Sequence, residues 1–439
     1  MEETINIVLV IIGGLVFFLG VVSEVIKKLN FSEPIAALLF GVLLSSAVSG
    51  VFNPDVWSHT LLEEVARLAV AVGVMGVALR VPFSYTRKHW KSVALMLILT
   101  MPFRWIASSV LIYWITGFGF TVSLLIGAIV TPTDPILTLS VVSGKLAEKN
   151  LPGRLRHFLL TESGSNEGLA YLFVILPILL MTLKPAEALS RWTVHTLLWE
   201  ISFSIILGAA AGYISGRMLR SAKSKGTIDS SSYYSYCLAL TLLVLGGVKL
   251  LKGEGILAVF AAGTIFSMVS TEEERHEEEH VVEGVDRFFM VPIFTLLGLV
   301  LPWQEWAKLG WEGLILAFLI LLLHRLPILL FTRSFIPDIR NNPDMLFAGW
   351  FGPVGIGAFY YSQVSMRHTG IMEIWPVVSL IICMSIFLHG VTATPFTKLY
   401  GKHTLQKPEY SKEKTEDQKS RLQNKEHFKV KSLQEVLKR

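Results

Sequence analysis

The stretch from Gly127 to Leu172 constrains the fold most, because it places polar and helix-breaking residues inside apolar sequence long enough to cross a bilayer. A membrane-spanning helix takes about 20 residues. The first interruption is Thr131–Pro135, and the second is Glu162–Gly168. A carboxylate at membrane depth is costly and marks a functional site by default. The three carboxylates of these interruptions therefore predict where the functional site lies.

The first interruption should break its helix. Pro132 and Pro135 each lack a backbone N–H, and each disfavours helical dihedral angles in the residue before it. The hydroxyls of Thr131 and Thr133 can satisfy backbone groups that the break releases. Unwound backbone and the ends of the flanking half-helices can face an ion, and Asp134 adds a full negative charge at the break.

The second interruption keeps helical spacing. Glu162 and Asn166 are four residues apart and share one face, while Ser163 and Glu167 share the neighbouring face. Ser163 and Glu167 can therefore point at Asp134 while Glu162 turns to another partner. A site that is rich in oxygen, with no imidazole or thiolate nearby, suits an alkali cation or a proton and not zinc or copper.

Composition places these features in a membrane protein. Of the 439 residues 52% are hydrophobic and 17% are charged, against about a quarter charged in soluble domains. The apolar residues form long blocks, which indicates an all-α polytopic membrane protein. Cys237 and Cys383 lie in apolar spans, so they indicate neither a disulfide framework nor a metal site. The net charge of +5 comes mainly from loops and the tail and does not indicate nucleic-acid binding.

We predict about thirteen transmembrane helices in residues 1–400 and a polar cytoplasmic tail in residues 401–439. Lys and Arg are concentrated in one set of alternate loops, so the positive-inside rule puts the N-terminus outside and the tail in the cytoplasm. An acidic run at 272–280 is interpreted as a cytoplasmic loop. The predicted spans lie at approximately 5–26, 34–52, 61–79, 92–115, 120–143, 158–183, 193–214, 233–250, 255–270, 288–303, 311–331, 345–364 and 374–397.

A second broken helix is expected in the twelfth span, where Gly349–Gly357 contains Gly352, Pro353 and Gly355. Paired breaks in the two halves of a transporter point to a substrate site where the broken helices cross. The two breaks are an odd number of spans apart, so the halves should be inverted with respect to each other. The sequence therefore predicts inverted repeats with two crossed broken helices.

Two arginines, Arg104 and Arg325, lie inside apolar helices at similar distances before the two breaks. A buried guanidinium needs a carboxylate partner, and we predict that Arg325 forms a structural ion pair with Glu162. Arg104 is either a membrane-end anchor or a second partner for the core. The ion pair would hold the broken helices in place and would not move ions.

The motif Thr-Pro-Thr-Asp-Pro at residues 131–135, followed by Glu-Ser-Gly-x-Asn and a carboxylate at 162–167, resembles the cation:proton antiporter superfamily. The most similar members are its NhaP-type and fungal plasma-membrane Na⁺/H⁺ antiporters. The resemblance implies an NhaA-like antiporter fold, with Asp134 on the unwound helix and the pairs Glu162-Ser163 and Asn166-Glu167 on the ion-binding helix. The family usually has Asp after the Asn, and Glu167 keeps that carboxylate with one more methylene.

We expect a secondary antiporter that exchanges a monovalent cation, most of all Na⁺, for H⁺ in an electroneutral cycle. Cation and protons would compete for Asp134 and Glu167, helped by Ser163, Asn166 and backbone oxygen near Thr133, and this competition would couple their movements. The first alternative is K⁺/H⁺ exchange by the same fold. A channel would need a ring-type filter and an intramembrane aspartyl protease a Gly-x-Gly-Asp motif. The sequence indicates neither, so we expect no enzymatic activity.

The expected partners are Na⁺, with Li⁺ or K⁺ as other cations, H⁺ and the lipid bilayer. We expect no cofactor and no nucleic acid. The chain should be a multi-pass homodimer in the plasma membrane, such as the inner membrane of a bacterium.

Overall fold

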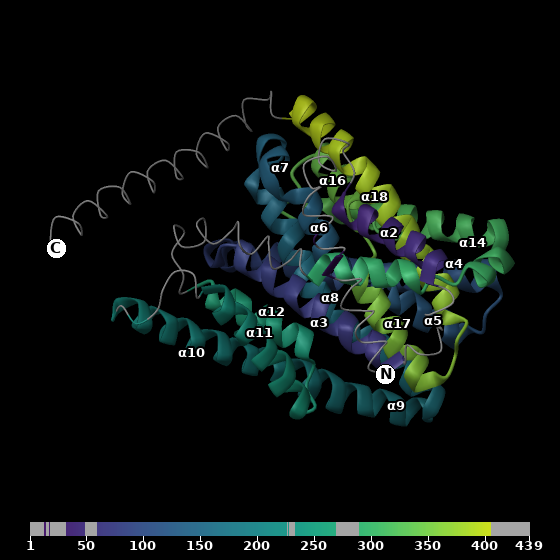
Figure 1. The fold of residues 1–439 in the computed structure, drawn as a ribbon, viewed down its shortest axis with the longest axis horizontal. Helices are drawn as coiled ribbons and strands as arrows, with labels where there is room; N and C mark the ends of the chain where they lie inside the picture. The colour runs from purple at the N-terminus through teal and green to yellow at the C-terminus, as the bar shows by residue number, and fades with distance from the viewer. Residues whose placement is uncertain are drawn as a thin grey trace.

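The computed structural model describes residues 32–48, 59–225, 233–268 and 289–404, together with the isolated positions 13, 14, 17 and 227. The described part is almost entirely helical (Figure 1), which confirms the predicted all-α class. Three predicted features lie outside the described residues: almost all of the first span, the acidic run at 272–280, and the tail beyond residue 404.

The helices follow one another without any described strand. The first part of the chain forms α2 (Glu33–Val48), α3 (His59–Arg80), α4 (Phe83–Thr116), α5 (Phe120–Ile129), α6 (Pro135–Val142), α7 (Gly144–Asn150), α8 (Gly153–Thr182), α9 (Pro185–Arg191), a π-helix (Trp192–Phe203) and α10 (Ser204–Ser224). The remainder forms α11 (Tyr233–Leu250), α12 (Gly255–Phe266), the helix Phe289–Leu299, α14 (Trp303–Leu323), α15 (Leu326–Thr332), a short 3₁₀ turn (Arg333–Phe335), α16 (Asn342–Trp350), α17 (Ile356–Thr369) and α18 (Ile374–Thr404).

Five helical runs in the described part are long and apolar enough to cross a membrane. They are Phe83–Thr116, Gly153–Thr182, Pro185–Ser224, Trp303–Phe335 and Ile374–Thr404. Shorter apolar helices lie between them, so the membrane-spanning character is confirmed, while the number thirteen stays a prediction. The seventh predicted span, 193–214, is part of a longer helical run in which the π-helix joins α9 to α10 without a turn.

Both predicted breaks are present. The span expected at 120–143 consists of α5 and α6, which are separated by residues 130–134. Asp134 caps α6, and Pro135 occupies its first turn, where a missing N–H costs nothing. The span expected at 345–364 consists of α16 and α17, which are separated by residues 351–355. Helix α17 therefore begins in the interior of the protein, directly after the run that contains Gly352, Pro353 and Gly355.

Helix α8 occupies the centre of the bundle. It packs against α4, α5, α6, α12 and α17 and also touches α16, so it contacts both halves of each broken helix. In Figure 1, α9 to α12 lie along one side of α3 and α8, while α6, α16, α18 and α14 lie on the other. Functional side chains on α8 are therefore placed where the two broken helices approach each other.

The contact between α10 and α12 brings two backbones together. A Cβ added to Gly208 or Gly212 would overlap the carbonyl oxygens of Ala258 and Ala262, respectively. Small residues four apart allow such close approach between membrane helices. A Cβ at Gly168 of α8 would lie 2.7 Å from the backbone nitrogen of Leu257. Helix α12 therefore packs closely against both α10 and the central helix α8.

Candidate functional site

Asp134 joins the two broken helices. Its Oδ1 accepts a hydrogen bond from the backbone N–H of Leu137 at 2.8 Å, and its Oδ2 accepts one from Ile356 at 2.5 Å. The first donor lies in the first turn of α6, and the second lies in the first turn of α17. The backbone N–H of Asp134 in turn donates to the carbonyl of Pro353 at 2.7 Å. One carboxylate thus faces the positive ends of two half-helices, which favours negative charge at this point.

Glu167 is buried next to the same turn of α17 but is bound quite differently. Its side chain is fully buried, and neither carboxylate oxygen has a hydrogen-bond partner among the described residues. A Cβ added to Gly357 would overlap this carboxylate, and one added to Gly355 would lie 2.6 Å from the carboxyl carbon of Asp134. The two carboxylates therefore contact the start of α17 at glycines that are two residues apart. In the described structure both oxygens of the Glu167 carboxylate are available to bind a ligand.

Asn166 ties α8 to the first break. Its Oδ1 accepts from the backbone N–H of Thr133 at 3.0 Å, and its Nδ2 lies 2.6 Å from the hydroxyl oxygen of Thr133 and 2.9 Å from Glu162 Oε1. The amide group is therefore engaged on both sides. Unwound backbone at membrane depth must find hydrogen-bond partners, and Asn166 supplies one for the backbone N–H of Thr133.

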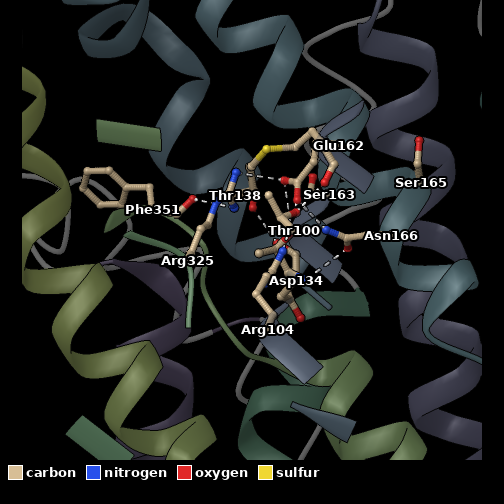
Figure 2. A network of polar contacts seen from close by, with 12 residues as sticks. Thr100, Arg104, Asp134, Thr138, Glu162, Ser163, Ser165, Asn166, Arg325 and Phe351 are labelled. Atoms are coloured by element: carbon tan, nitrogen blue, oxygen red, sulfur yellow. Dashed lines mark hydrogen bonds and ion pairs between the residues drawn. The ribbon is translucent and has the colours of Figure 1, made fainter. Parts of the chain in front are cut away.

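Glu162 is shared by two arginines. Arg325 Nη2 lies 3.1 Å from Glu162 Oε2, and Arg104 Nη1 lies 3.2 Å from Oε1. Figure 2 shows the two guanidinium groups converging on this carboxylate, with Asn166 and Asp134 beside it. All three charged side chains are at most 1% exposed. The predicted contact between Glu162 and Arg325 is present, and of the two possibilities for Arg104 the structure has the core partner.

The central cluster carries an uneven number of charges. Arg104 and Arg325 are positive, while Glu162, Asp134 and Glu167 are negative when ionised, which leaves one negative charge. Burying an uncompensated charge is costly. One monovalent cation or one proton would make the cluster neutral.

The second break is held by α18. Ser385 Oγ accepts a hydrogen bond from the backbone N–H of Val354 at 2.8 Å. His389 Nε2 lies 2.9 Å from the carbonyl oxygen of Trp350, and its Nδ1 lies 2.9 Å from the carbonyl oxygen of Ser385. These side chains replace helical hydrogen bonds that the break removes, and they form a counterpart to the role of Asn166 at the first break.

The structure brings most of the predicted site residues together. Asp134, Glu167, Asn166, Thr133 and Glu162 lie at the crossing. The hydroxyl of Ser163 donates to the carbonyl of Leu160 at 3.0 Å, and that of Thr131 donates to Gly127 at 2.7 Å. Ser163 therefore makes no hydrogen bond to Asp134 in the described structure, although its oxygen keeps an acceptor position.

Three features of the site were not found from the sequence. Ser385 and His389 support the second break, Gly357 accommodates Glu167, and Glu254 is a further buried carboxylate that caps α12 through the backbone N–H groups of Ile256 and Leu257. Gly357, in the run Gly355-Ile356-Gly357, was a possible signal that another group approaches the backbone closely at this position. Nothing in the sequence alone pairs Ser385 with a distant backbone N–H.

The described residues contain no group of three or more His, Cys, Asp or Glu side chains placed to hold a metal ion. The two carboxylates at the α17 turn are hard oxygen donors, which suit an alkali cation as a transported substrate.

A helical membrane bundle with two broken helices that cross at buried carboxylates defines a class, the secondary transporters with discontinuous helices. Comparison with known proteins specifies the family. The family described as "Sodium/hydrogen exchanger, transmembrane" matches residues 14–399. The chain therefore belongs to the sodium/hydrogen exchanger family.

Individual relatives agree with this assignment. The chain is 34% identical over 414 residues to a "Probable Na(+)/H(+) antiporter C3A11.09" of Schizosaccharomyces pombe, which covers 87% of this chain and 54% of that protein. It is 30% identical over 418 residues to a "Na(+)/H(+) antiporter" of the same yeast, with 88% and 89% covered. The chain thus spans about half the length of the first relative and most of the second.

A solved structure supports the fold. The sodium proton antiporter MjNhaP1 from Methanocaldococcus jannaschii superposes with a TM-score of 0.72 at 17% identity, and the match covers 91% of this chain and all of that one. This likeness confirms the predicted antiporter fold.

Proposed function

We propose that the protein exchanges Na⁺ for H⁺ across a membrane, with Asp134 and Glu167 as the shared ligands of both. The single observation that carries the proposal is the pair of buried carboxylates at the first turn of α17, one of them without hydrogen-bond partners in the described structure. The names of the relatives, which are Na⁺/H⁺ antiporters, agree with it.

The difference between the two carboxylates supports a division of roles. Asp134 accepts two backbone N–H groups, which favour its ionised form, and we infer that it stays ionised through the cycle. Glu167 has no such donors and would take up either a proton or the cation. Because both ligands need Glu167 free, binding of one excludes the other, and this exclusion couples their transport.

The rest of the cluster serves as a fixed support. Asn166 and Thr133 hold the first break against α8, and Arg104 and Arg325 neutralise Glu162 and hold it in place. Access to the site would alternate as one group of helices moves against the other. We further propose a homodimer in the lipid bilayer of the plasma membrane, with the N-terminus outside and the C-terminus in the cytoplasm.

Purified protein in lipid vesicles tests the function. A pH-sensitive dye inside the vesicles should report alkalinisation or acidification when Na⁺, Li⁺ or K⁺ is offered separately, with the direction set by the cation gradient. Vesicles that contain the Glu167→Gln protein serve as the control and should show no response. A cation flux that leaves the internal pH unchanged when membrane potential is collapsed would indicate a channel and reject antiport.

A further inference from the structure

Gly357 occupies a position where no side chain fits while Glu167 keeps its place. The three atoms nearest to a Cβ built on Gly357 all belong to the Glu167 carboxyl group, and Oε2 is 2.7 Å away. The φ angle of Gly357 is not in the left-handed region, so the backbone itself would accept other residues. Glycine is therefore required here by the carboxylate that fills the space, and not by the backbone conformation.

The same helix turn receives Asp134 in the same way. A Cβ on Gly355 would lie 2.6 Å from the carboxyl carbon of Asp134. Glycine thus occupies two positions at the start of α17. The space beside Gly355 contains the carboxylate of Asp134, which precedes α6, and the space beside Gly357 contains that of Glu167, which lies on α8. The separation between these carboxylates depends on how far each side chain reaches into its gap.

We propose that Gly357 and Glu167 together determine the size of the cation that the site accepts. This inference rests on the proposed function. The extra methylene of Glu167, relative to the Asp that is usual in the family, lets its carboxylate fill the gap at Gly357, which lies two residues along the chain from the gap that contains Asp134. The longer side chain narrows the space between the two carboxylates and favours a smaller cation.

Cation selectivity in proteins follows cavity size, ligand number and ligand flexibility. Shortening residue 167 by one methylene withdraws its carboxylate from α17 and enlarges the space beside Asp134. Adding a methyl group at 357 pushes the longer Glu167 side chain out of its gap. Because the displaced group is the far end of a flexible side chain, the fold should survive and only the ligand geometry should change.

The experiment compares wild type, Gly357→Ala, Glu167→Asp and the double variant. A matched control is Gly246→Ala, because Gly246 is also helical but has no atom within 4 Å of an added Cβ. Two quantities are measured for each protein: exchange in vesicles with Na⁺, Li⁺ and K⁺, and the rise in melting temperature that each chloride salt causes relative to choline chloride. The second quantity reports cation binding without transport.

We expect Gly357→Ala to raise the Na⁺ concentration for half-maximal exchange by about tenfold or more, since small displacements of a ligand are costly. Glu167→Asp should raise the ratio of K⁺ to Na⁺ effects by about tenfold or more, which is the lower end of the effect of one methylene in a pocket. The double variant should recover toward the Glu167→Asp protein, because the shorter acid leaves room for the added methyl group. Gly246→Ala should behave like wild type.

Full activity of Gly357→Ala, a double variant no better than Gly357→Ala, or an unchanged ratio in Glu167→Asp would each overturn the inference. The thermal measurement separates this result from the function itself. If cations raise the melting temperature of wild type without any exchange, the proposed function fails while the selectivity pattern still decides the inference. A wild-type protein whose melting temperature is insensitive to all three cations rejects the inference directly.

Discussion

At the residue scale, Glu167 and Asp134 should respond differently to removal of their charge. Glu167→Gln should abolish cation-dependent proton movement in vesicles, because the amide can neither release a proton nor neutralise a cation. Its melting temperature should stay the same or rise, because an ionised group without hydrogen-bond donors is costly to bury. Wild-type exchange by this variant would remove Glu167 from the site.

Asp134→Asn should abolish exchange and also lower the melting temperature. The carboxylate accepts from the backbone of Leu137 and Ile356, whereas an amide has one oxygen and would turn an NH₂ group toward the other donor. A buried donor without an acceptor costs about 1–3 kcal/mol. If this variant melted at the same temperature as Glu167→Gln, the contrast between the two carboxylates would be wrong.

Glu162→Gln should destabilise the protein more than removal of either arginine. A change at either Arg104 or Arg325 leaves Glu162 paired with the other guanidinium. Loss of the Glu162 carboxylate instead leaves both buried guanidinium groups without their ion-pair partner. Breaking a buried pair costs about 3–5 kcal/mol in soluble proteins. Thermal melting of Glu162→Gln, Arg104→Met and Arg325→Met in one detergent gives the order. The prediction fails if an arginine variant melts lowest.

Charge balance explains which contacts at this scale could be predicted from sequence. A lone guanidinium in an apolar helix needs a carboxylate, and Glu162 was available because it lies on a different face of α8 from Glu167. Sequence could not decide whether Arg104 joins the same carboxylate, since that depends on how deeply α4 packs. The engagement of Asn166 with Thr133 and Glu162 also depends on three-dimensional distances that helical spacing does not give.

At the element scale, α18 should stabilise the second broken helix through Ser385. Ser385→Ala leaves the backbone N–H of Val354 without its acceptor, which costs about 1–3 kcal/mol when the group is buried. Ser365→Ala is the matched control, because the buried hydroxyl of Ser365 has no hydrogen-bond partner in the described structure. The first change should lower the melting temperature, and the second should leave it unchanged or raise it. Equal effects would mean that Ser385 does not hold the break.

The breaks themselves were predictable because Pro and Gly act locally. Pro132 and Pro135 lie three residues apart, and together they break the first helix; the Gly-Pro-x-Gly sequence at 352–355 breaks the second. A single proline is not enough, because Pro102, Pro177 and Pro395 each lie inside a continuous helix. The π-helix between α9 and α10 was not predicted, since no proline or glycine lies within it and its mixture of apolar residues with Thr, His, Glu and Ser is that of an ordinary helix. Local chemistry thus predicts where helices stop better than how they continue.

At the scale of the whole molecule, the sequence predicts the crossing of two broken helices but not the surface that the rest of the bundle forms around it. The α10–α12 contact depends on Gly208 and Gly212 meeting two alanines, and small residues are too common in membrane helices to identify such a pair beforehand. The number of spans likewise depends on segment boundaries that apolar composition leaves several residues wide.

The whole transport cycle should be electroneutral, with one cation exchanged for one proton. The five charged side chains of the central cluster carry one net negative charge when ionised, so one Na⁺ or one H⁺ makes the cluster neutral in either loaded state. Because the cluster is neutral both with Na⁺ bound and with H⁺ bound, the exchange moves no net charge across the membrane. If charge did move, the membrane potential would shift the equilibrium by about 2.3 kcal/mol per charge per 100 mV.

The null point of exchange measures this stoichiometry. Vesicles are clamped at zero and at about 100 mV with potassium and valinomycin, and the Na⁺ gradient that just prevents a pH change is determined at each potential. The same gradient should balance the same pH difference at both potentials, because Asp134 keeps its charge against two helix N-termini and Glu167 alone changes partners. A null point that moves with voltage would mean that Asp134 also exchanges a proton, and a second proton per cation would then have to be assigned to it.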